Sequence, residues 1–389
     1  MSLRIGVLKE TPSGEKRVAI VPADLKVLKA LGAEIVIEAD AGAASTYTDS
    51  AYEAAGATMA KTREELLATC PVALFVSPET GLKGPGRSDQ LFVGMGDALS
   101  KPGPHEALAK GGASIIALEL LPRITRAQSM DVLSSMATLL GYRGVLLAAE
   151  ALPRVFPLMM TAAGTLAPAR VLIMGVGVAG LSAIATSKRL GASVLAYDVR
   201  AAAKEQVASL GAKFLEIEVD SSEAEGTGGY AKAVSEDFLA RQRAAMLKAV
   251  SESDVVIATA GVPGKKAPIL VTRAMVEAMR PGSVVVDLMA EYGGNCEVTK
   301  AGATESVGAV SVLGPTHVVS SLGAHASQMF SRNILNFLKL IVKKGELVLD
   351  MEDEIVRDVL VARGGAVVQP RVREALGLAS VTMASGTLE

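Results

Sequence analysis

The chain has 389 residues, half of them hydrophobic and 21% charged, so it is long enough for two domains with large packed cores. Its formal net charge is −2 and no block of like charges occurs, which argues against a nucleic-acid partner. Two cysteines, Cys70 and Cys296, are too few for a disulfide framework and indicate a reducing compartment. The N-terminus lacks the apolar run of a signal peptide.

The mean hydropathy is positive, +0.37, which raises the question of a membrane segment. The most apolar stretch, 130–152, contains Asp131, Arg143 and Glu150. A charged side chain near the middle of a bilayer costs at least about 2.5 kcal/mol, and no window offers the roughly 20 uncharged apolar residues that a span needs, so the chain is interpreted as a soluble protein.

Short apolar runs alternate with helical patterns in the first part of the chain, which is typical of βαβ units and a mostly parallel sheet. Pro22 near its start and Gly32 just past its end delimit one expected helix. A second expected helix covers 105–110. The expected strands are 3–8, 34–38, 71–76, 91–93 and 114–118.

A long helical pattern at 126–152 precedes a run, 153–169, whose four prolines or glycines predict a hinge or domain boundary. Later, an amphipathic helix is expected at 327–342 and a hairpin within 348–368, around Gly364-Gly365. The expected later strands are 170–174, 193–197, 254–259, 283–288 and 310–313.

The pattern as a whole predicts an α/β fold: two Rossmann-like domains with mostly parallel sheets, separated by a cleft and joined by long helices. The expected domains are 1–130 with 327–389, and 131–326.

The segment Gly175-Val176-Gly177-Val178-Ala179-Gly180 has the G-x-G-x-x-G spacing and lies between an aliphatic strand and an expected helix. In a dinucleotide site the three glycines allow the tight turn, the close approach of the pyrophosphate and the packing of helix on strand. Asp198 ends the next strand, where a carboxylate binds the adenosine ribose and favours NAD over NADP. Arg200 leaves this selectivity open, because a nearby arginine can accept a 2′-phosphate.

Two strand ends agree with this site, because cofactors lie at the carboxyl edge of open α/β sheets. They are Thr259-Ala260-Gly261 and Ala290-Glu291. The three histidines, His105, His317 and His325, have no metal-ligand spacing and are expected to be structural or on the surface. No metal site is predicted.

Two polar segments remain open on residue grounds alone. Residues 123–135 predict a helix start, with Thr125 as N-cap and Gln128 as its capping-box partner, but that interpretation leaves Arg123, Asp131 and Ser134 unexplained. Such a loop can instead hold a nicotinamide. Residues 220–230, DSSEAEGTGGY, cannot pack a core and are either idle surface or a mobile functional loop.

Several motifs together resemble the NAD(H)-binding domain I of proton-translocating nicotinamide nucleotide transhydrogenases. They are LPRITRAQSMDVLSS, the following Gly141-Tyr142-Arg143, the segment MMTAAGTLAPARVLIMGVGVAGLSAIATSKRLGA, and GGYAK. The resemblance runs from Gly6 to about Pro370, and its most distinctive part is RxxRAQSMDxLSS. With no membrane segment following, the chain looks like the separate soluble α1-type subunit.

The resemblance implies a role for each cluster. Arg123, Gln128, Asp131 and Ser134 match the loop that contacts the nicotinamide and its ribose, which is the catalytic set. The matching cofactor contacts are Tyr142, Gly175, Gly177, Val178, Ala179, Gly180, Asp198, Val199, Arg200, Gly229, Tyr230, Gln242 and Gly261. Gly229 and Tyr230 match the tip of a loop that closes over the nucleotide. At Gly261 relatives can carry a leucine, so only its backbone contact carries over.

The implied reaction is direct hydride transfer from NADH to NADP⁺, for which no general base is needed on this chain. The NADP(H) belongs to a partner, the beta subunit or domain III, and a membrane-spanning component couples the reaction to proton translocation. The family domain is a homodimer. The chain is therefore expected to be cytoplasmic and peripherally associated with the inner membrane through its partners.

The same fold resembles that of alanine dehydrogenase, and Lys9-Glu10 with the segment 15–19 fits both families. The dehydrogenases, however, bind and deprotonate their substrate with a lysine and a histidine from the first domain. At the matching places this chain has Phe75-Val76-Ser77-Pro78 and Val93-Gly94-Met95-Gly96, which disfavours oxidative deamination. A third alternative is an NAD sensor that catalyses nothing.

Overall fold

The computed structural model describes residues 2–83, 86–216, 236–261 and 264–379. The chain forms two compact units: unit 1 comprises 1–136 and 319–389, and unit 2 comprises 137–318. The expected domains had their boundaries at 130/131 and 326/327. The observed boundary between Met136 and Ala137 falls inside a helix, α6 (Val132–Ala151), which begins in unit 1 and continues into unit 2.

Unit 1 contains an eight-stranded sheet in the order β19-β18-β6-β5-β4-β1-β2-β3. Strands β1 to β6 pair in parallel in a 3-2-1-4-5-6 arrangement, which is the doubly wound order. Two antiparallel strands extend one edge. The bounds are β1 Leu3–Val7, β2 Ala33–Glu38, β3 Thr58–Ala60, β4 Val72–Leu74, β5 Leu91–Gly94, β6 Ser114–Ala117, β18 Leu360–Arg363 and β19 Ala366–Val367.

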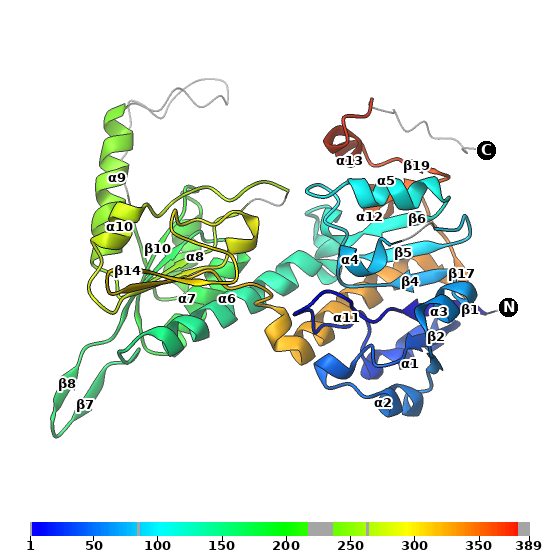
Figure 1. The fold of residues 1–389 in the computed structure, drawn as a ribbon, viewed down its shortest axis with the longest axis horizontal. Coiled ribbons are helices and arrows are strands. Elements are labelled where there is room, and N and C mark those ends of the chain that lie inside the picture. Colours follow the sequence, from blue (N-terminus) through cyan, green and yellow to red (C-terminus); the bar gives the residue numbers. More distant parts are fainter. Residues whose placement is uncertain (1, 84–85, 217–235, 262–263, 380–389) are drawn as a thin grey trace. The chain divides into compact units, whose positions relative to one another are not determined.

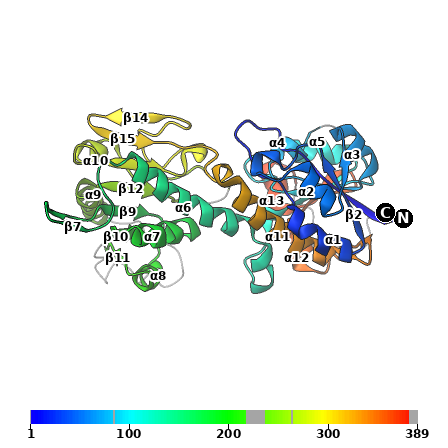
Figure 2. The same ribbon diagram turned by 90° about the horizontal axis from the view of Figure 1, so that it is seen from below.

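Helices cover both faces of this sheet, with α3 and α5 on one side and α1 and α12 on the other (Figure 2). Gly32, past the end of α1, has a φ of +87°, the left-handed conformation expected of a helix-ending glycine. The bounds are α1 Leu25–Ala30, α2 Asp49–Ala54, α3 Arg63–Thr69, α4 Pro78–Gly81, α5 Gly103–Lys110, α11 Gly323–Ile341, α12 Glu354–Val359 and α13 Pro370–Ala375.

Unit 2 repeats the same arrangement. Its sheet order is β11-β10-β9-β12-β13-β15-β14, again 3-2-1-4-5-6 for the parallel strands, with antiparallel β14 at the edge. The two mostly parallel α/β sheets confirm the expected fold class. The bounds are β9 Arg170–Met174, β10 Ser193–Tyr197, β11 Lys213–Phe214, β12 Val255–Ala258, β13 Val284–Asp287, β14 Thr304–Val307 and β15 Val310–Leu313.

The central strands of unit 2 are buried on both faces, which explains their unbroken aliphatic sequences. Val171 and Ile173 pack towards α6, α7 and α8, whereas Leu172 and Met174 pack towards α9 and α10. The helix bounds are α7 Val178–Arg189, α8 Ala203–Ser209, α9 Glu236–Ser251 and α10 Arg273–Glu277.

The segment 153–169 is not the expected boundary but lies within unit 2. It contains an antiparallel hairpin, β7 (Met159–Thr161) and β8 (Gly164–Leu166), whose six strand residues are all exposed. Figures 1 and 2 show this hairpin projecting away from the unit 2 sheet.

Near the C-terminus the expected hairpin within 348–368 is shorter than predicted. Helix α12 occupies the first part, and β18 and β19 form the hairpin around Gly364-Gly365. A further two-stranded pair, β16 (Val342–Lys343) and β17 (Glu346–Leu347), follows α11.

Among the described helices, α6 is long and apolar enough to cross a membrane by length and composition alone, with 33% of its apolar window buried. One such helix is weak evidence, because the core helix of a soluble protein passes the same test.

Candidate functional site

The glycine turn of unit 2 lies where the strand order reverses, between the carboxyl ends of β9 and β12. Gly175 has a φ of +94°, and a Cβ there would lie 2.9 Å from the amide nitrogen of Ala260. At Gly180 a Cβ would lie 1.9 Å from the carbonyl oxygen of Gly175, so helix α7 can pack this closely only with glycine. A Cβ at Gly177 would meet nothing within 4 Å, which leaves room above the turn.

Helix α7 presents its N-terminus to this open space. Its N-cap is Gly177, which supplies no side-chain hydrogen bond to the first turn. Val178 is 42% exposed, whereas Ala179 is buried against the fold. Uncapped N–H groups and the positive end of the helix dipole favour an anion, so the turn fits the pyrophosphate of a dinucleotide.

Asp198 follows β10, and its side chain is only 8% exposed. Its Oδ2 accepts a hydrogen bond of 2.7 Å from the backbone N–H of Val176, and its Oδ1 accepts one of 2.9 Å from the N–H of Arg200. The Arg200 guanidinium forms an ion pair with the same carboxylate. Burial would raise the pKa of Asp198, but hydrogen bonds from Arg200 and Val176 hold it below its usual value. Val199, between them, is 80% exposed.

Three further contacts hold the edge of this site. The hydroxyl of Thr259 donates to the carbonyl of Gly175 at 2.9 Å. Asn295 both donates to and accepts from the backbone of Ala260, at 2.8 and 3.1 Å, which fixes the residue before the exposed Gly261. Gln242 on α9 donates to the hydroxyl of Tyr197 at 2.6 Å. Asn295 was not predicted, and its spacing from Ala260 gives no signal in the sequence.

The distinctive 123–134 segment of unit 1 differs from its predicted form. It is not the start of one long helix: a 3-10 helix, Thr125–Met130, ends at Asp131, and α6 begins at Val132. The N-cap of the 3-10 helix is Ile124 and makes no side-chain capping bond, so the predicted Thr125–Gln128 capping box is wrong.

Asp131 caps α6 instead. Its Oδ1 accepts the backbone N–H of Ser134 at 2.9 Å, and its Oδ2 accepts the Ser134 hydroxyl at 2.5 Å. A side chain that accepts from the third residue of a helix is an N-cap, and it starts the helix here because Asp131 has an extended ψ of 94°. Arg123 and Gln128, in the loop before it, are exposed.

Long-range contacts hold this loop in unit 1. The guanidinium of Arg126 binds the carboxylate of Asp353 through two hydrogen bonds of 2.6 and 2.7 Å. From α11, Asn333 and Asn336 both donate to the carbonyl of Ser129, at 3.0 and 3.1 Å. These anchors lie more than 200 residues away along the chain, and the sequence pattern gives no signal for them.

The structure brings together, within unit 2, the cofactor candidates of the glycine turn and those of 198–200, with Gln242 bonded to Tyr197 at the end of β10. Tyr142 lies on α6 in unit 2 and is 41% exposed. The four catalytic candidates belong to unit 1. Gly229 and Tyr230, with the rest of 220–230, lie outside the described residues.

In unit 1 the strand order reverses between β1 and β4. No glycine turn follows β1 there, and a carboxylate bonds to the backbone at the end of β4 instead. Glu10, past the end of β1, accepts hydrogen bonds from the N–H groups of Val76 and Ser77 at 2.7 and 3.1 Å, and from the Ser77 hydroxyl at 2.5 Å. Burial raises the pKa of Glu10, although these hydrogen bonds oppose the rise. At the end of β5, the N–H of Gly96 donates to Glu119 at 2.9 Å. The residues at the ends of β4 and β5, 75–78 and 93–96, include no lysine or histidine.

Of the three histidines, His317 and His325 are exposed, and His105 is fully buried in α5, where its imidazole packs against Gly96 and burial lowers its pKa to about 4. Within the described residues no group of three His, Cys, Asp or Glu side chains could hold a metal ion.

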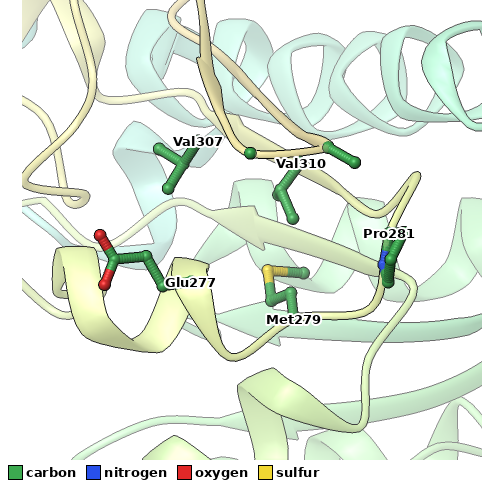
Figure 3. Close-up of a pocket in the computed structure, with 7 residues that line it drawn as sticks. Glu277, Met279, Pro281, Val307 and Val310 are labelled. Carbon is green, nitrogen blue, oxygen red and sulfur yellow. The ribbon is translucent and has the colours of Figure 1, made fainter.

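A shallow pocket of about 190 Å³ lies at the opposite edge of the unit 2 sheet (Figure 3). It is lined by Met279, Pro281, Val310 and their neighbours at the amino ends of β13 and β15. Dinucleotides bind at the carboxyl ends of such strands, and the pocket is mainly aliphatic, so it is not the cofactor site.

Family models cover almost the whole chain. The N-terminal domain model of the alanine dehydrogenase/PNT family matches residues 6–140, and its C-terminal domain model matches residues 144–370.

The individual proteins that are similar to this chain include both transhydrogenases and alanine dehydrogenases. The chain is 47% identical over 378 residues to the first part of the NAD(P) transhydrogenase alpha subunit of Rhodospirillum rubrum, covering 95% of this chain and 98% of that protein. A transhydrogenase structure from Sinorhizobium meliloti superposes with a TM-score of 0.83 at 43% identity, covering 94% of this chain and all of that one. An alanine dehydrogenase of Mycolicibacterium smegmatis is 30% identical over 297 residues, covering 75% of this chain and 73% of that protein.

Proposed function

The chain belongs to the family of NAD(P) transhydrogenase alpha subunits, and we propose that it binds NAD(H) and exchanges hydride with NADP(H) held on a partner subunit. The family makes it a component of an NAD(P)⁺ transhydrogenase, an oxidoreductase. The observation that carries the proposal is the glycine turn of unit 2, whose room above Gly177 and uncapped α7 suit a pyrophosphate, with Asp198 at the end of the next strand.

Each group of residues then has one task. The backbone of 175–180 binds the pyrophosphate, and Asp198, Val199 and Gln242 contact the adenosine half. Arg123, Gln128, Asp131 and Ser134 orient the nicotinamide end, with Tyr142 near it. The bound dihydronicotinamide supplies the hydride, so the chain itself needs no general base; what it provides is positioning of the donor carbon.

The partners follow from the same proposal. An NADP(H)-binding beta subunit or domain III holds the acceptor nucleotide, and a membrane-spanning component couples the reaction to proton translocation. The chain then works on the cytoplasmic side, held at the inner membrane by these partners.

We further propose that the chain is a homodimer, with the β7–β8 hairpin as part of the interface. Leu158, Met159, Met160 and Leu166 are between 41% and 77% exposed on this hairpin. An isolated two-stranded sheet is marginally stable in water, and clustered exposed apolar side chains mark interaction surfaces. A second copy of the chain would cover them.

Alanine dehydrogenase is the second candidate, favoured by the 30% identity to the mycobacterial enzyme. The ends of β4 and β5 argue against it, because Ser77 and Gly96 there are bonded to carboxylates of the same unit and are not themselves bases. His105, which packs against Gly96, is fully buried and so is not open to an amino-acid substrate.

The direct test mixes the purified chain with an NADP(H)-binding partner domain and follows NADH-driven reduction of NADP⁺ or of an NADP⁺ analogue with a distinct spectrum. We expect turnover only when both proteins are present. NADH binding without any turnover would contradict the proposal and favour an NAD sensor. Reduction of NAD⁺ by alanine without the partner would identify a dehydrogenase.

A residue-level arm uses Gln128→Asn, which shortens an exposed side chain by one methylene. We expect hydride transfer to fall by at least about tenfold, since misplacing a reacting group costs rate, with NADH affinity nearly unchanged. The matched control is Gln206→Asn on α8, another exposed glutamine, which should alter neither property.

A further inference from the structure

The side chain of Arg200 is held by two anchors in unit 2. Its Nε donates to Oδ1 of Asp198 at 2.9 Å, and its Nη2 donates to Oδ2 at 3.1 Å, which is a two-pronged pairing with the carboxylate. The same Nη2 also donates to the carbonyl oxygen of Val176, in the glycine turn, at 3.1 Å. The guanidinium is therefore folded back onto the turn although the side chain is 60% exposed.

Asp198 is fixed in turn. Besides the two side-chain bonds from Arg200, its oxygens accept the backbone N–H groups of Val176 and Arg200. The pKa of Asp198 is lowered and that of Arg200 is raised, so both groups stay charged near neutral pH. An arginine in this arrangement has most of its directed donors already used.

This geometry bears on the choice between NAD(H) and NADP(H), which differ by a 2′-phosphate on the adenosine ribose. In this fold a carboxylate after the second strand binds the ribose hydroxyls, whereas a free arginine nearby accepts the 2′-phosphate. Both residue types are present here, two positions apart, and each is bonded to the other.

We propose that the Asp198–Arg200 pair determines the nucleotide specificity of this subunit: Arg200 is kept from acting as a 2′-phosphate receptor by its pairing with Asp198 and its bond to the Val176 carbonyl. The proposal rests on the proposed binding of NAD(H) in unit 2. Asp198 thus excludes NADP(H) in two ways: its charge repels the phosphate, and its hydrogen bonds immobilise the cation that would otherwise attract it. An unpaired Arg200 would reverse the second effect and attract the phosphate.

The experiment measures binding of NADH and NADPH to the full-length chain by calorimetry and by the fluorescence of the reduced nicotinamide. Four proteins are compared: the wild type, Asp198→Asn, Arg200→Gln and the double variant. In Asp198→Asn the amide oxygen can still accept from Val176, while the two-pronged ion pair is lost. We expect NADPH affinity to rise by at least about tenfold in this variant, because a charge-assisted hydrogen bond to the phosphate becomes available.

The double variant separates the two effects of Asp198. If Arg200 is the receptor, the double variant loses the added NADPH affinity, and Arg200→Gln alone gains none. An equal gain with and without Arg200 would overturn the proposal and leave only charge repulsion. A loss of NADPH affinity in Arg200→Gln alone would also overturn it, since Arg200 would then already be free to bind phosphate.

If the Asp198→Asn variant folds poorly, Asp198→Ser takes its place, alone and combined with Arg200→Gln. Comparing 2′,5′-ADP with 5′-ADP as probes isolates the contribution of the 2′-phosphate, and the same pattern of gain and loss is expected. Wild-type binding of NADH is scored separately: its absence refutes the proposed function, whereas its presence without the Arg200-dependent gain refutes only the specificity proposal.

Discussion

At the residue scale, Asp131 has a structural contact and a proposed functional one, and substitution can separate them. Its carboxylate caps α6 through Ser134, and removing a capping side chain costs about 1 kcal/mol. We expect Asp131→Ala to lower the free energy of unfolding by roughly that amount, and Asp131→Asn, which retains an accepting oxygen, to lower it less.

The same pair of variants tests the contact with the nicotinamide end. We expect Asp131→Asn to slow hydride transfer to the partner's nucleotide by about tenfold while remaining folded, because it loses the charge but keeps the cap. Normal turnover in Asp131→Asn would show that this residue only starts the helix. Unfolding by urea and the two-protein assay give the two readouts.

The arrangement of the glycine turn and Asp198 was predictable because these residues obey a local rule. The fingerprint glycines, the strand before them and Asp198 lie in one βαβ segment, so spacing alone predicted that they lie together; their contact with a nucleotide is part of the proposed function. The Asp131 cap was missed because Thr125 and Gln128 imitate a capping box three residues apart. The Arg200–Asp198 pairing could not be predicted either, since sequence order does not reveal which rotamer an arginine adopts.

At the scale of elements, the loop after β1 contains an ion pair, and a hydrogen bond to its carboxylate joins this loop to the segment where the chain re-enters unit 1. The Arg17 guanidinium donates to both oxygens of Glu15, at 2.8 and 2.6 Å, and the Ser320 hydroxyl donates to the same carboxylate at 2.7 Å. The side chains of Glu15 and Arg17 are 4% and 11% exposed. Burial would raise the pKa of Glu15, but the Arg17 contacts dominate and lower it to about 2.

The stability of the protein should depend on Glu15 in a pH-dependent way. Because the folded-state pKa lies below the unfolded value of about 4.3, the stabilisation is complete above that value and is lost as the pH falls towards 2. Glu15→Gln leaves Arg17 without its charge partner, and breaking a buried pair costs about 3–5 kcal/mol.

We therefore expect Glu15→Gln to lower the unfolding midpoint strongly at pH 7 and by less as the pH is reduced from about 4.5 towards 3. Ser320→Ala, which removes one donor, serves as the milder control. Thermal unfolding recorded at several pH values checks both; a difference between wild type and Glu15→Gln that stays constant over this range would contradict the assignment.

The elements that the sequence predicted least well are those without an internal pattern. Most strands in the two sheets were predicted to within a few residues, because buried parallel strands are continuous apolar runs. The β7–β8 hairpin was hidden in a proline- and glycine-containing run, and α12 is too short for helical periodicity. Contacts distant in sequence fix α12, because Asp353 caps it and also binds Arg126.

At the scale of the whole molecule, the family assignment leaves the number of copies to be tested. The sequence predicted a homodimer only through resemblance, since no pattern distinguishes an apolar residue of an interface from one of the core. The structure adds a specific candidate, the hairpin with Met160 at 77% exposure, the most exposed of its large apolar side chains.

We expect Met160→Asp to convert a dimer into a monomer or to weaken it by at least about tenfold, because a charge replaces an apolar contact that would be desolvated between copies. Val348→Asp is the matched control: Val348 is also an exposed apolar residue, at 44%, and lies in unit 1 away from the hairpin sequence. Sedimentation over a range of concentrations reports the mass of each variant. If Met160→Asp and Val348→Asp both keep the wild-type mass, the hairpin does not contribute to the interface. If the wild type itself is monomeric, the homodimer proposal fails while NADH binding and hydride transfer remain separately testable.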